Sequence, residues 1–305
     1  MSDADPNPVP SPGDPAAIAY IDGAWGAPTT LTIALNDRGL LLADGLFETL
    51  LLENGLPQLL EAHLTRWHTS ADLLGLPPPP DAACVRPLIE EAIRRSGIRT
   101  GALRLNWSRG SSGRGLDLPE PGQAGATARF WLQLSATTAC FDPISVVISS
   151  SEQRLAGSVL SRCKTFSYGS AIQARRQARA LGADDALLTS SAGGLCCGTS
   201  ANLLVQRQGS WLTPPLASGC LPGILRGQAL AMGLAQEAPL ELTDLQSWWR
   251  QGDGACLLIN SLSCRPIRSL EGARLPVVAG EPLWRRLMQD DNIREITDGL
   301  PAPSP

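Results

Sequence analysis

The chain has 305 residues, of which 43% are hydrophobic, 18% are charged and 5% are aromatic, and its formal net charge is -4. This size excludes a small disulfide-stapled scaffold and favours two domains with a substantial core. The sequence has no run of about 18 apolar residues that could span a membrane, no signal-peptide pattern and no basic cluster for nucleic acid. We therefore expect a soluble cytoplasmic protein with neither a membrane nor a nucleic-acid partner.

The numbers of cysteine, histidine and lysine residues limit the kinds of active site that the chain can form. The eight cysteines form no CxxC pair, and there are two histidines, His63 and His68, so the sequence predicts no metal site and reduced, mostly buried thiols. Among 25 Lys and Arg residues, Lys164 is the only lysine. Arginine cannot act as an amine nucleophile, because its guanidinium stays protonated. Lys164 is the candidate reactive amine, unless it is a chance survivor, and the neighbouring motifs decide between these alternatives.

The first part of the chain is predicted to form an α+β domain, preceded by a disordered tail over 1–17 that is rich in Pro, Asp and Ser. Apolar alternation and the Asn54–Gly55 turn predict hairpin strands, and helical periodicity appears on both sides of a PPPP run. The expected order is a strand pair in 19–35, a second pair within 46–64, helices at 63–76 and 85–98, and strands at 102–110 and 128–136.

The second part alternates strands and helices, which is typical of an α/β domain. Strands are expected at 144–150, 185–190, 201–209, 210–214 and 255–260, and helices at 171–182, 224–236 and 242–252. We therefore predict an N-terminal domain over 18–137, a linker over 138–145, a C-terminal domain over 146–295 and a tail over 296–305. Two such domains usually bind a ligand in the crevice between them, so we expect the chemistry there.

Several elements suit an anion. The loop over 108–121 carries Arg109 and Arg114 among glycines and serines, and arginine binds a carboxylate or phosphate through paired hydrogen bonds. The helix beginning near Ile224 offers free N–H groups, Arg66 lies on a helix face, and Ser261 follows an apolar strand. Each element is also compatible with an ordinary turn or a solvated side chain. Together with a single lysine, they suggest pyridoxal 5′-phosphate, which needs an amine and a phosphate-binding site.

The ordered motifs resemble those of fold-type IV pyridoxal-phosphate enzymes, the group of branched-chain aminotransferases, D-amino acid aminotransferases and 4-amino-4-deoxychorismate lyases. In chain order, the motifs over about 19–292 are IDG, DRGLLLADGLFETL, AHLTRW, the arginine loop, KTFSYGSAIQARRQARALGADDALL, GTSANL, LTPPLASGCLPGILR and NSLSCRPI. The resemblance implies a smaller N-terminal α/β domain, a C-terminal α/β pseudo-barrel domain that binds the cofactor, and a homodimer.

The resemblance also implies roles for individual residues. Lys164 matches the lysine that binds the cofactor covalently and transfers protons, and Tyr168 matches the tyrosine near the ring hydroxyl. The phosphate would be held by Arg66, by the N–H groups of Ile224 and Leu225, and by Ser261 and Leu262. The RGSSGRG loop resembles the lyase branch, in which Arg114 would hold a carboxylate of a small-molecule substrate.

One residue departs from the family pattern. Cys197 stands where the family has the glutamate that keeps the pyridine nitrogen protonated, and there is no Asp or Glu between Asp185 and Glu237. A thiol is a weak partner for that nitrogen. Loss of the acid should harm a transaminase more than a lyase, because aromatisation of the substrate helps to drive the lyase reaction. We therefore expect a 4-amino-4-deoxychorismate lyase of folate biosynthesis. The alternatives are a branched-chain or D-amino acid aminotransferase and a non-catalytic cofactor-binding protein.

Overall fold

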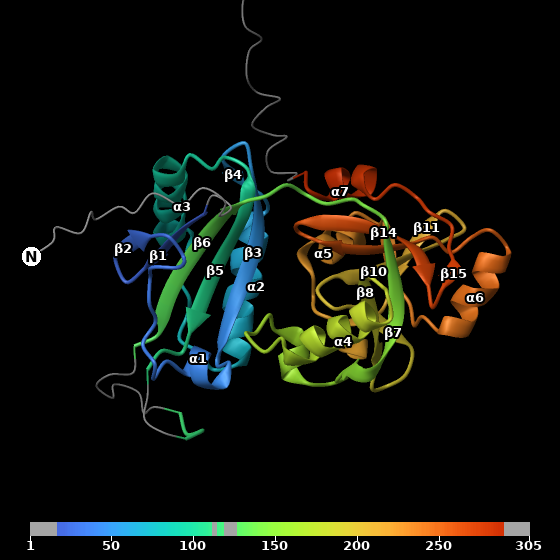
Figure 1. Cartoon of the computed structure of the whole chain (residues 1–305), viewed down its shortest axis with the longest axis horizontal. Helices are drawn as coiled ribbons and strands as arrows, with labels where there is room; N and C mark the ends of the chain where they lie inside the picture. The colour runs from blue at the N-terminus through green and yellow to red at the C-terminus, as the bar shows by residue number, and fades with distance from the viewer. Residues whose placement is uncertain (1–16, 112–114, 119–126, 290–305) are drawn as a thin grey trace, which may run out of the picture. The chain divides into compact units, whose positions relative to one another are not determined.

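The computed structural model describes residues 17–111, 115–118 and 127–289. The chain forms two compact units: unit 1 contains Met1–Ala139 and Leu155–Gln173, and unit 2 contains Cys140–Arg154 and Ala174–Pro305 (Figure 1). The chain first passes from unit 1 to unit 2 after Ala139, which lies inside the predicted linker over 138–145. The segment Leu155–Gln173, which carries Lys164, differs from the predicted division because it belongs to unit 1. The predicted tails lie outside the described residues, apart from residue 17.

Unit 1 is built on a six-stranded antiparallel sheet with the strand order β2-β1-β6-β5-β3-β4. The predicted turn between β3 and β4 is confirmed, with Asn54 and Gly55 at φ angles of 54° and 84°. The strands are β1 (Ala17–Ile21), β2 (Ala24–Gly26), β3 (Gly45–Glu53), β4 (Leu56–Pro57), β5 (Gly101–Ser108) and β6 (Arg129–Ala136).

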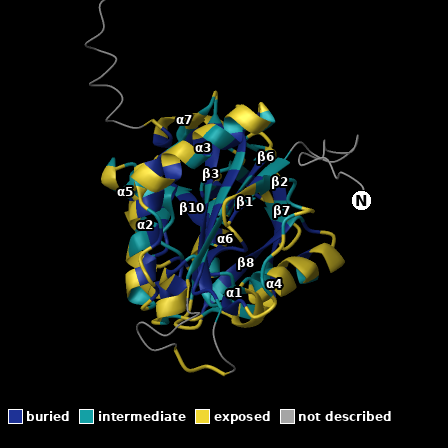
Figure 2. Ribbon diagram, turned by 90° about the vertical axis from the view of Figure 1, so that its left-hand side faces the viewer, coloured by how far each residue is buried: buried dark blue, intermediate teal, exposed yellow. Residues whose placement is uncertain are grey.

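Helices cover one face of this sheet. Alternate leucines of β3, β5 and β6 form the core with apolar residues of α2 (Leu60–Leu73) and α3 (Ala82–Ser96), including Trp67 and Ile89. Both helices were predicted, whereas the short helix α1 (Arg38–Leu42) was not. Figure 2 shows β3 largely in dark blue, as expected for a central strand with this burial. The remaining helical segments are η1 (Val159–Arg162) and α4 (Gly169–Ala180), and α4 continues from unit 1 into unit 2.

The edge of β3 that does not pair with β5 receives a returning segment of the chain, Lys164–Phe166. Side chains alternate along a strand, so Leu46, Glu48 and Leu50 point towards the helices and Phe47 points to the opposite face. The N–H of Phe47 donates to the carbonyl of Lys164 at 2.9 Å, and the N–H of Phe166 donates to the carbonyl of Gly45 at 3.0 Å. These bonds explain why the lysine segment belongs to unit 1.

Unit 2 contains a mixed sheet in which six strands form a ring, β10-β13-β14-β7-β8-β9, closed by pairing of β9 with β10. This arrangement agrees with the predicted pseudo-barrel. The strands are β7 (Ile144–Arg154), β8 (Asp185–Ser190), β9 (Leu195–Gly198), β10 (Asn202–Arg207), β11 (Ser210–Thr213), β12 (Ala235–Glu237), β13 (Cys256–Asn260), β14 (Ser263–Leu270) and β15 (Ala273–Arg274).

The helical segments of unit 2 are η2 (Leu216–Ser218), α5 (Ile224–Ala231), α6 (Leu242–Arg250) and α7 (Glu281–Leu287). The prediction that this helix continues to Gln236 is wrong. The helix α5 ends at Ala231, because Gly233 adopts a positive φ of 65° and the chain then enters β12. Six of the eight cysteines are buried and all eight are free thiols, as predicted. None of the helices within 17–111, 115–118 and 127–289 has the length and apolar character needed to cross a membrane.

Candidate active site

Lys164 lies among aromatic side chains on the face of the unit 1 sheet opposite the helices. Its Nζ donates to the Tyr168 hydroxyl at 3.1 Å and lies 4.2 Å from the centroid of the Phe47 ring. The Phe47 and Tyr168 rings are 5.4 Å apart. We call Lys164, Tyr168, Phe47 and Arg104 the amine site. Its lysine and tyrosine are the two residues that the sequence analysis expected near the reacting atoms of the cofactor.

Arg104 of the amine site was missed by the sequence analysis. Its Cζ lies 3.6 Å from the centroid of the Phe47 ring, and its Nε donates to Asn106 Oδ1 at 2.7 Å. Its two terminal nitrogens have no acceptor among the residues that the structure describes. Burial lowers the pKa of Arg104, but a guanidinium remains charged at neutral pH. The arginine therefore presents a charged pair of donors that suits a carboxylate.

Arg66 lies on α2 in a buried cluster with Glu48 and His63. Its Nε donates to Glu48 Oε1 at 2.9 Å and its Nη2 to Glu48 Oε2 at 2.5 Å, while His63 Nδ1 lies 2.7 Å from Oε2. Burial would raise the pKa of Glu48, but the charge of Arg66 and the hydrogen bonds from both partners lower it to about 2. Burial lowers the pKa of His63, so the imidazole is neutral at pH 7 and donates from Nδ1. Glu48 thus fixes the orientation of the predicted phosphate arginine.

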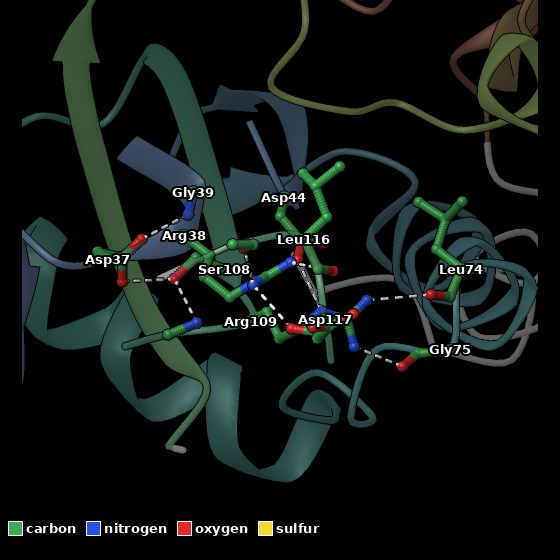
Figure 3. A network of polar contacts seen from close by, with 12 residues as sticks. Asp37, Arg38, Gly39, Asp44, Leu74, Gly75, Ser108, Arg109, Leu116 and Asp117 are labelled. Carbon is green, nitrogen blue, oxygen red and sulfur yellow. Dashed lines mark hydrogen bonds and ion pairs between the residues drawn. The ribbon is translucent and has the colours of Figure 1, made fainter. Parts of the chain in front are cut away.

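Arg109, predicted as an anion ligand of the loop over 108–121, serves the fold instead. It donates to Asp44 Oδ2 at 2.8 Å and to the carbonyls of Gly75 at 2.7 Å and Leu74 at 3.1 Å (Figure 3). Arg109 points at these acceptors from the end of β5, so its donors are engaged within the protein. These internal acceptors favour the structural alternative for Arg109 over the role of anion ligand in this loop. Arg114 lies outside the described residues.

Arg38 and Arg109 share the carboxylate of Asp44. Arg38 donates to Asp44 Oδ2 at 2.8 Å and also contacts the carbonyls of Gly115, Leu116 and Asp117 at 3.2–3.4 Å (Figure 3). Burial would raise the pKa of Asp44, but the two arginines hold it below its ordinary value. Asp44 therefore stays ionised, and Arg38 attaches residues 115–117 to α1.

In unit 2, the first N–H groups of α5 lack acceptors among the described residues. Its N-cap Gly223 has no side-chain cap, and the N–H groups of Ile224 and Leu225 have no acceptor among the described residues. The Asn202 amide donates to the carbonyl of Leu221 at 2.9 Å, and a Cβ on Gly223 would lie 1.9 Å from Asn202 Oδ1. Asn202 therefore fixes the approach to a helix N-terminus that can accept a phosphate.

Ser261 and Leu262 follow β13, as the sequence analysis expected. The N–H of Leu262 donates to Asn260 Oδ1 at 2.8 Å, and the carbonyl of Leu262 accepts from Cys140 N at 3.0 Å. The N–H of Leu262 is therefore engaged inside the protein, unlike those of Ile224 and Leu225.

Cys197 is buried in β9 and pairs with Leu188 of β8 and Asn202 of β10. Among the described residues of unit 2, Asp185 is the one buried carboxylate. It accepts hydrogen bonds from Thr199 Oγ1 at 2.6 Å and from Arg175 Nη2 at 2.8 Å. Asp185 thus has partners within unit 2, and the glutamate that the family motif would place at 197 is replaced by a buried thiol.

The comparisons with known proteins agree with this geometry. Residues 45–270 match the family model described as amino-transferase class IV. The chain belongs to the class IV aminotransferase family. Enzymes of this family use pyridoxal 5′-phosphate, which is the cofactor of this protein.

Several relatives of the class IV enzyme have names that differ in reaction. It is 26% identical to a Mycobacterium tuberculosis bifunctional aminodeoxychorismate lyase / D-amino acid transaminase, over 85% of this chain and 93% of that protein. It is 28% identical to a Methanocaldococcus jannaschii protein provisionally named a branched-chain-amino-acid aminotransferase, over 74% and 80% of the chains. A Legionella pneumophila structure provisionally named 4-amino-4-deoxychorismate lyase is 27% identical, with a TM-score of 0.73 over 89% and 97% of the chains.

The residues of the class IV enzyme fit the cofactor. An amine held by a phenol hydroxyl and an aromatic ring is present at Lys164, and α5 presents uncapped N–H groups for a phosphate. Glycine at 223 is required by the close approach of Asn202. The class IV enzyme therefore contains both an amine for the carbonyl carbon of the cofactor and donors for its phosphate.

Proposed function

We propose that this enzyme is a lyase that cleaves 4-amino-4-deoxychorismate to 4-aminobenzoate and pyruvate. The observation that carries the proposal is that Arg104 and Lys164 both lie against the Phe47 ring, and that the terminal nitrogens of Arg104 have no acceptor among the described residues. The proposed substrate bears one amine and two carboxylates. A branched-chain amino acid bears a single carboxylate, so it could pair with only one of the two arginines, Arg104 and Arg114.

The bound cofactor supplies a carbonyl carbon for the substrate amine and a ring that withdraws electrons from the reacting carbon. Lys164 would take a proton from the substrate ring and return one to the departing enolpyruvate. The Tyr168 hydroxyl, 3.1 Å from Nζ, would hold the amine in place for both transfers. Arg104 would bind one carboxylate, and we assign the other to Arg114 by resemblance.

For the phosphate, we propose by resemblance Arg66 and the N–H groups of Ile224 and Leu225. Ser261 and Leu262 are included by resemblance, although the N–H of Leu262 has Asn260 as its acceptor. The ion pair with Glu48 supports this role for Arg66, because it fixes the guanidinium before the cofactor arrives.

Cys197 supports the lyase over a transaminase. A thiol in place of a carboxylate gives less stabilisation of negative charge on the cofactor ring. The lyase depends less on that stabilisation, because loss of enolpyruvate makes the substrate ring aromatic. A transaminase has no comparable contribution from its substrate.

The test is an assay of purified protein with pyridoxal 5′-phosphate and 4-amino-4-deoxychorismate. We expect equal amounts of 4-aminobenzoate and pyruvate, and borohydride reduction should leave the cofactor attached to the peptide containing Lys164. Lys164→Ala should lose both results, whereas Cys84→Ser, at an exposed position, should keep them. Turnover by Lys164→Ala, or absence of 4-aminobenzoate from the wild type, would refute the proposal.

D-amino acid transamination is the second candidate, because the Mycobacterium tuberculosis relative is named for both reactions. A transaminase would transfer the amino group of D-alanine to 2-oxoglutarate without forming 4-aminobenzoate. Measuring both products with the same protein sample separates the two functions. Cofactor attachment to Lys164 without either activity would favour the non-catalytic alternative.

We also propose that the enzyme is a homodimer. Six leucines of unit 1 are exposed, between 43% and 83%, on and around α1: Leu35, Leu40, Leu41, Leu42, Leu116 and Leu118. A group of exposed apolar side chains of this kind is typical of an association surface. Light scattering should give twice the mass of one chain, and Leu41→Glu should shift the mass towards the monomer. A monomeric wild type would refute this part of the proposal.

A further inference from the structure

The ring of Phe166, two residues after Lys164, occupies space that is open because residues 39 and 45 are glycines. An ideal Cβ on Gly45 would lie 2.2 Å from Phe166 Cε2, and one on Gly39 would lie 2.9 Å from the same atom. The ring of Trp131 is 5.5 Å away and that of Phe47 is 6.4 Å away. The ring of Phe166 therefore fits a seat formed by two glycines and two aromatic residues.

The backbone around this seat sets the register of the lysine segment. The carbonyl of Lys164 and the N–H of Phe166 bond to Phe47 and Gly45, and the side chain of the intervening Thr165 is buried. A shift of two residues along β3 would move Nζ by about 7 Å, away from the Tyr168 hydroxyl. In the observed register the Phe166 ring lies over Gly45, and a register that moved this ring off the glycine would lose the packing.

We infer that Phe166 is a positioning residue for Lys164, and that its seat on Gly45 and Gly39 fixes where the reactive amine lies. The inference deepens the proposed function and rests on Lys164 being the amine that reacts. The Phe47 ring packs near both residues. Its centroid lies 6.4 Å from that of Phe166 and 4.2 Å from the Nζ of Lys164.

The experiment follows the amine in the cofactor-free protein. Because Lys164 is the only lysine, reductive methylation with ¹³C-formaldehyde labels it and the N-terminal amine alone, so its NMR signal and labelling rate are directly measurable. We expect Phe166→Leu to change the labelling rate of Lys164 and shift its signal, and to weaken pyridoxal 5′-phosphate binding about tenfold. Ile89→Val, which trims the unit 1 core away from the seat, should lower stability without either effect.

A second pair of variants tests the contact itself. Gly45→Ala should disturb the Lys164 signal by displacing the ring, and the added methyl should matter less when residue 166 is leucine. The effects of Gly45→Ala and Phe166→Leu on labelling rate should therefore be non-additive in the double variant. Additive effects, or a Phe166→Leu protein with the wild-type signal and labelling rate, would overturn the inference. Failure of borohydride to attach the cofactor to wild-type Lys164 would instead count against the proposed function, because the amine measurement needs no cofactor.

Discussion

Cys197 and Asn202 face each other across the pair that closes the strand ring of unit 2. Cys197 stands at the position of the acid in the family motif, and Asn202 holds the approach to α5 through Leu221. This one residue pair therefore joins two candidate parts of the site: the position where the family has its acid, and the segment that leads to the candidate phosphate donors of α5. Each member of the pair can be changed separately, which leads to the first two predictions.

Cys197→Glu should raise transamination of D-alanine by more than tenfold, because a carboxylate would stabilise a protonated cofactor nitrogen and the charge that develops on the ring. The rate with 2-oxoglutarate as acceptor, measured at saturating cofactor, checks this. Cys197→Gln is the matched control, because it has the same shape and no charge. Equal rates for the Glu and Gln variants would contradict the prediction.

Asn202→Ala should weaken pyridoxal 5′-phosphate binding and cost about 1 to 2 kcal/mol of stability, because Leu221 loses its hydrogen bond and the approach to α5 loosens. Thr213→Val is a suitable comparison. It removes another buried hydrogen bond of unit 2, from Thr213 to the carbonyl of Leu203 at 2.8 Å. Calorimetric titration and thermal unfolding should show a stability loss in both variants and an affinity loss in Asn202→Ala alone.

The same substitution at two arginines should have opposite consequences. Arg109→Lys loses the donors that reach Asp44, Leu74 and Gly75, so we expect a loss of about 1 to 3 kcal/mol in the free energy of unfolding with little change in KM. Arg104→Lys should raise KM for the dicarboxylate substrate about tenfold or more with little loss of stability. Urea unfolding and steady-state kinetics on both variants check the pair, and a swap of the two outcomes would refute it.

Acidification should destabilise the protein in two stages. The folded protein disfavours protonation of His63, whose pKa is lowered, so stability should begin to fall as pH drops below 6.5. Glu48, with a pKa lowered from 4.5 to about 2, should add a loss on the order of 3 kcal/mol as pH falls through that interval. Urea unfolding between pH 8 and pH 4 measures the first stage and the start of the second. His63→Asn should remove the first stage, and an unchanged profile would contradict the assignment.

The sequence predicted the elements whose side chains follow a simple period. The helices at Leu60–Leu73 and Ala82–Ser96 and the Asn54–Gly55 hairpin belong to this class, because their burial pattern repeats along the chain. The end of α5 was missed, since Gly233 interrupts a stretch that still looks helical. The return of Leu155–Gln173 to unit 1 was also missed, because two backbone hydrogen bonds to β3 leave no side-chain signature.

The site was predictable where one residue type is rare or a motif is shared with the family. Lys164 stood out as the single lysine and Tyr168 was named by resemblance, whereas the hydrogen bond between them is seen only in the structure. Arg104 and Arg109 could not be told apart from sequence. Arg104 lies within β5 and Arg109 directly follows it, and only the acceptors around each guanidinium separate a fold-stabilising arginine from one whose terminal nitrogens have no acceptor among the described residues.

The division of unit 1 into two chain segments has a consequence for synthesis. On the ribosome, Gly45–Phe47 of β3 emerges more than a hundred residues before Lys164–Phe166, the segment that pairs with it. This edge of β3 stays unpaired while Cys140–Arg154, the first stretch of unit 2, is synthesised. A nascent chain halted before residue 160 would therefore expose an unpaired strand edge and lack Lys164, so the amine site forms only after the first stretch of unit 2 has been made.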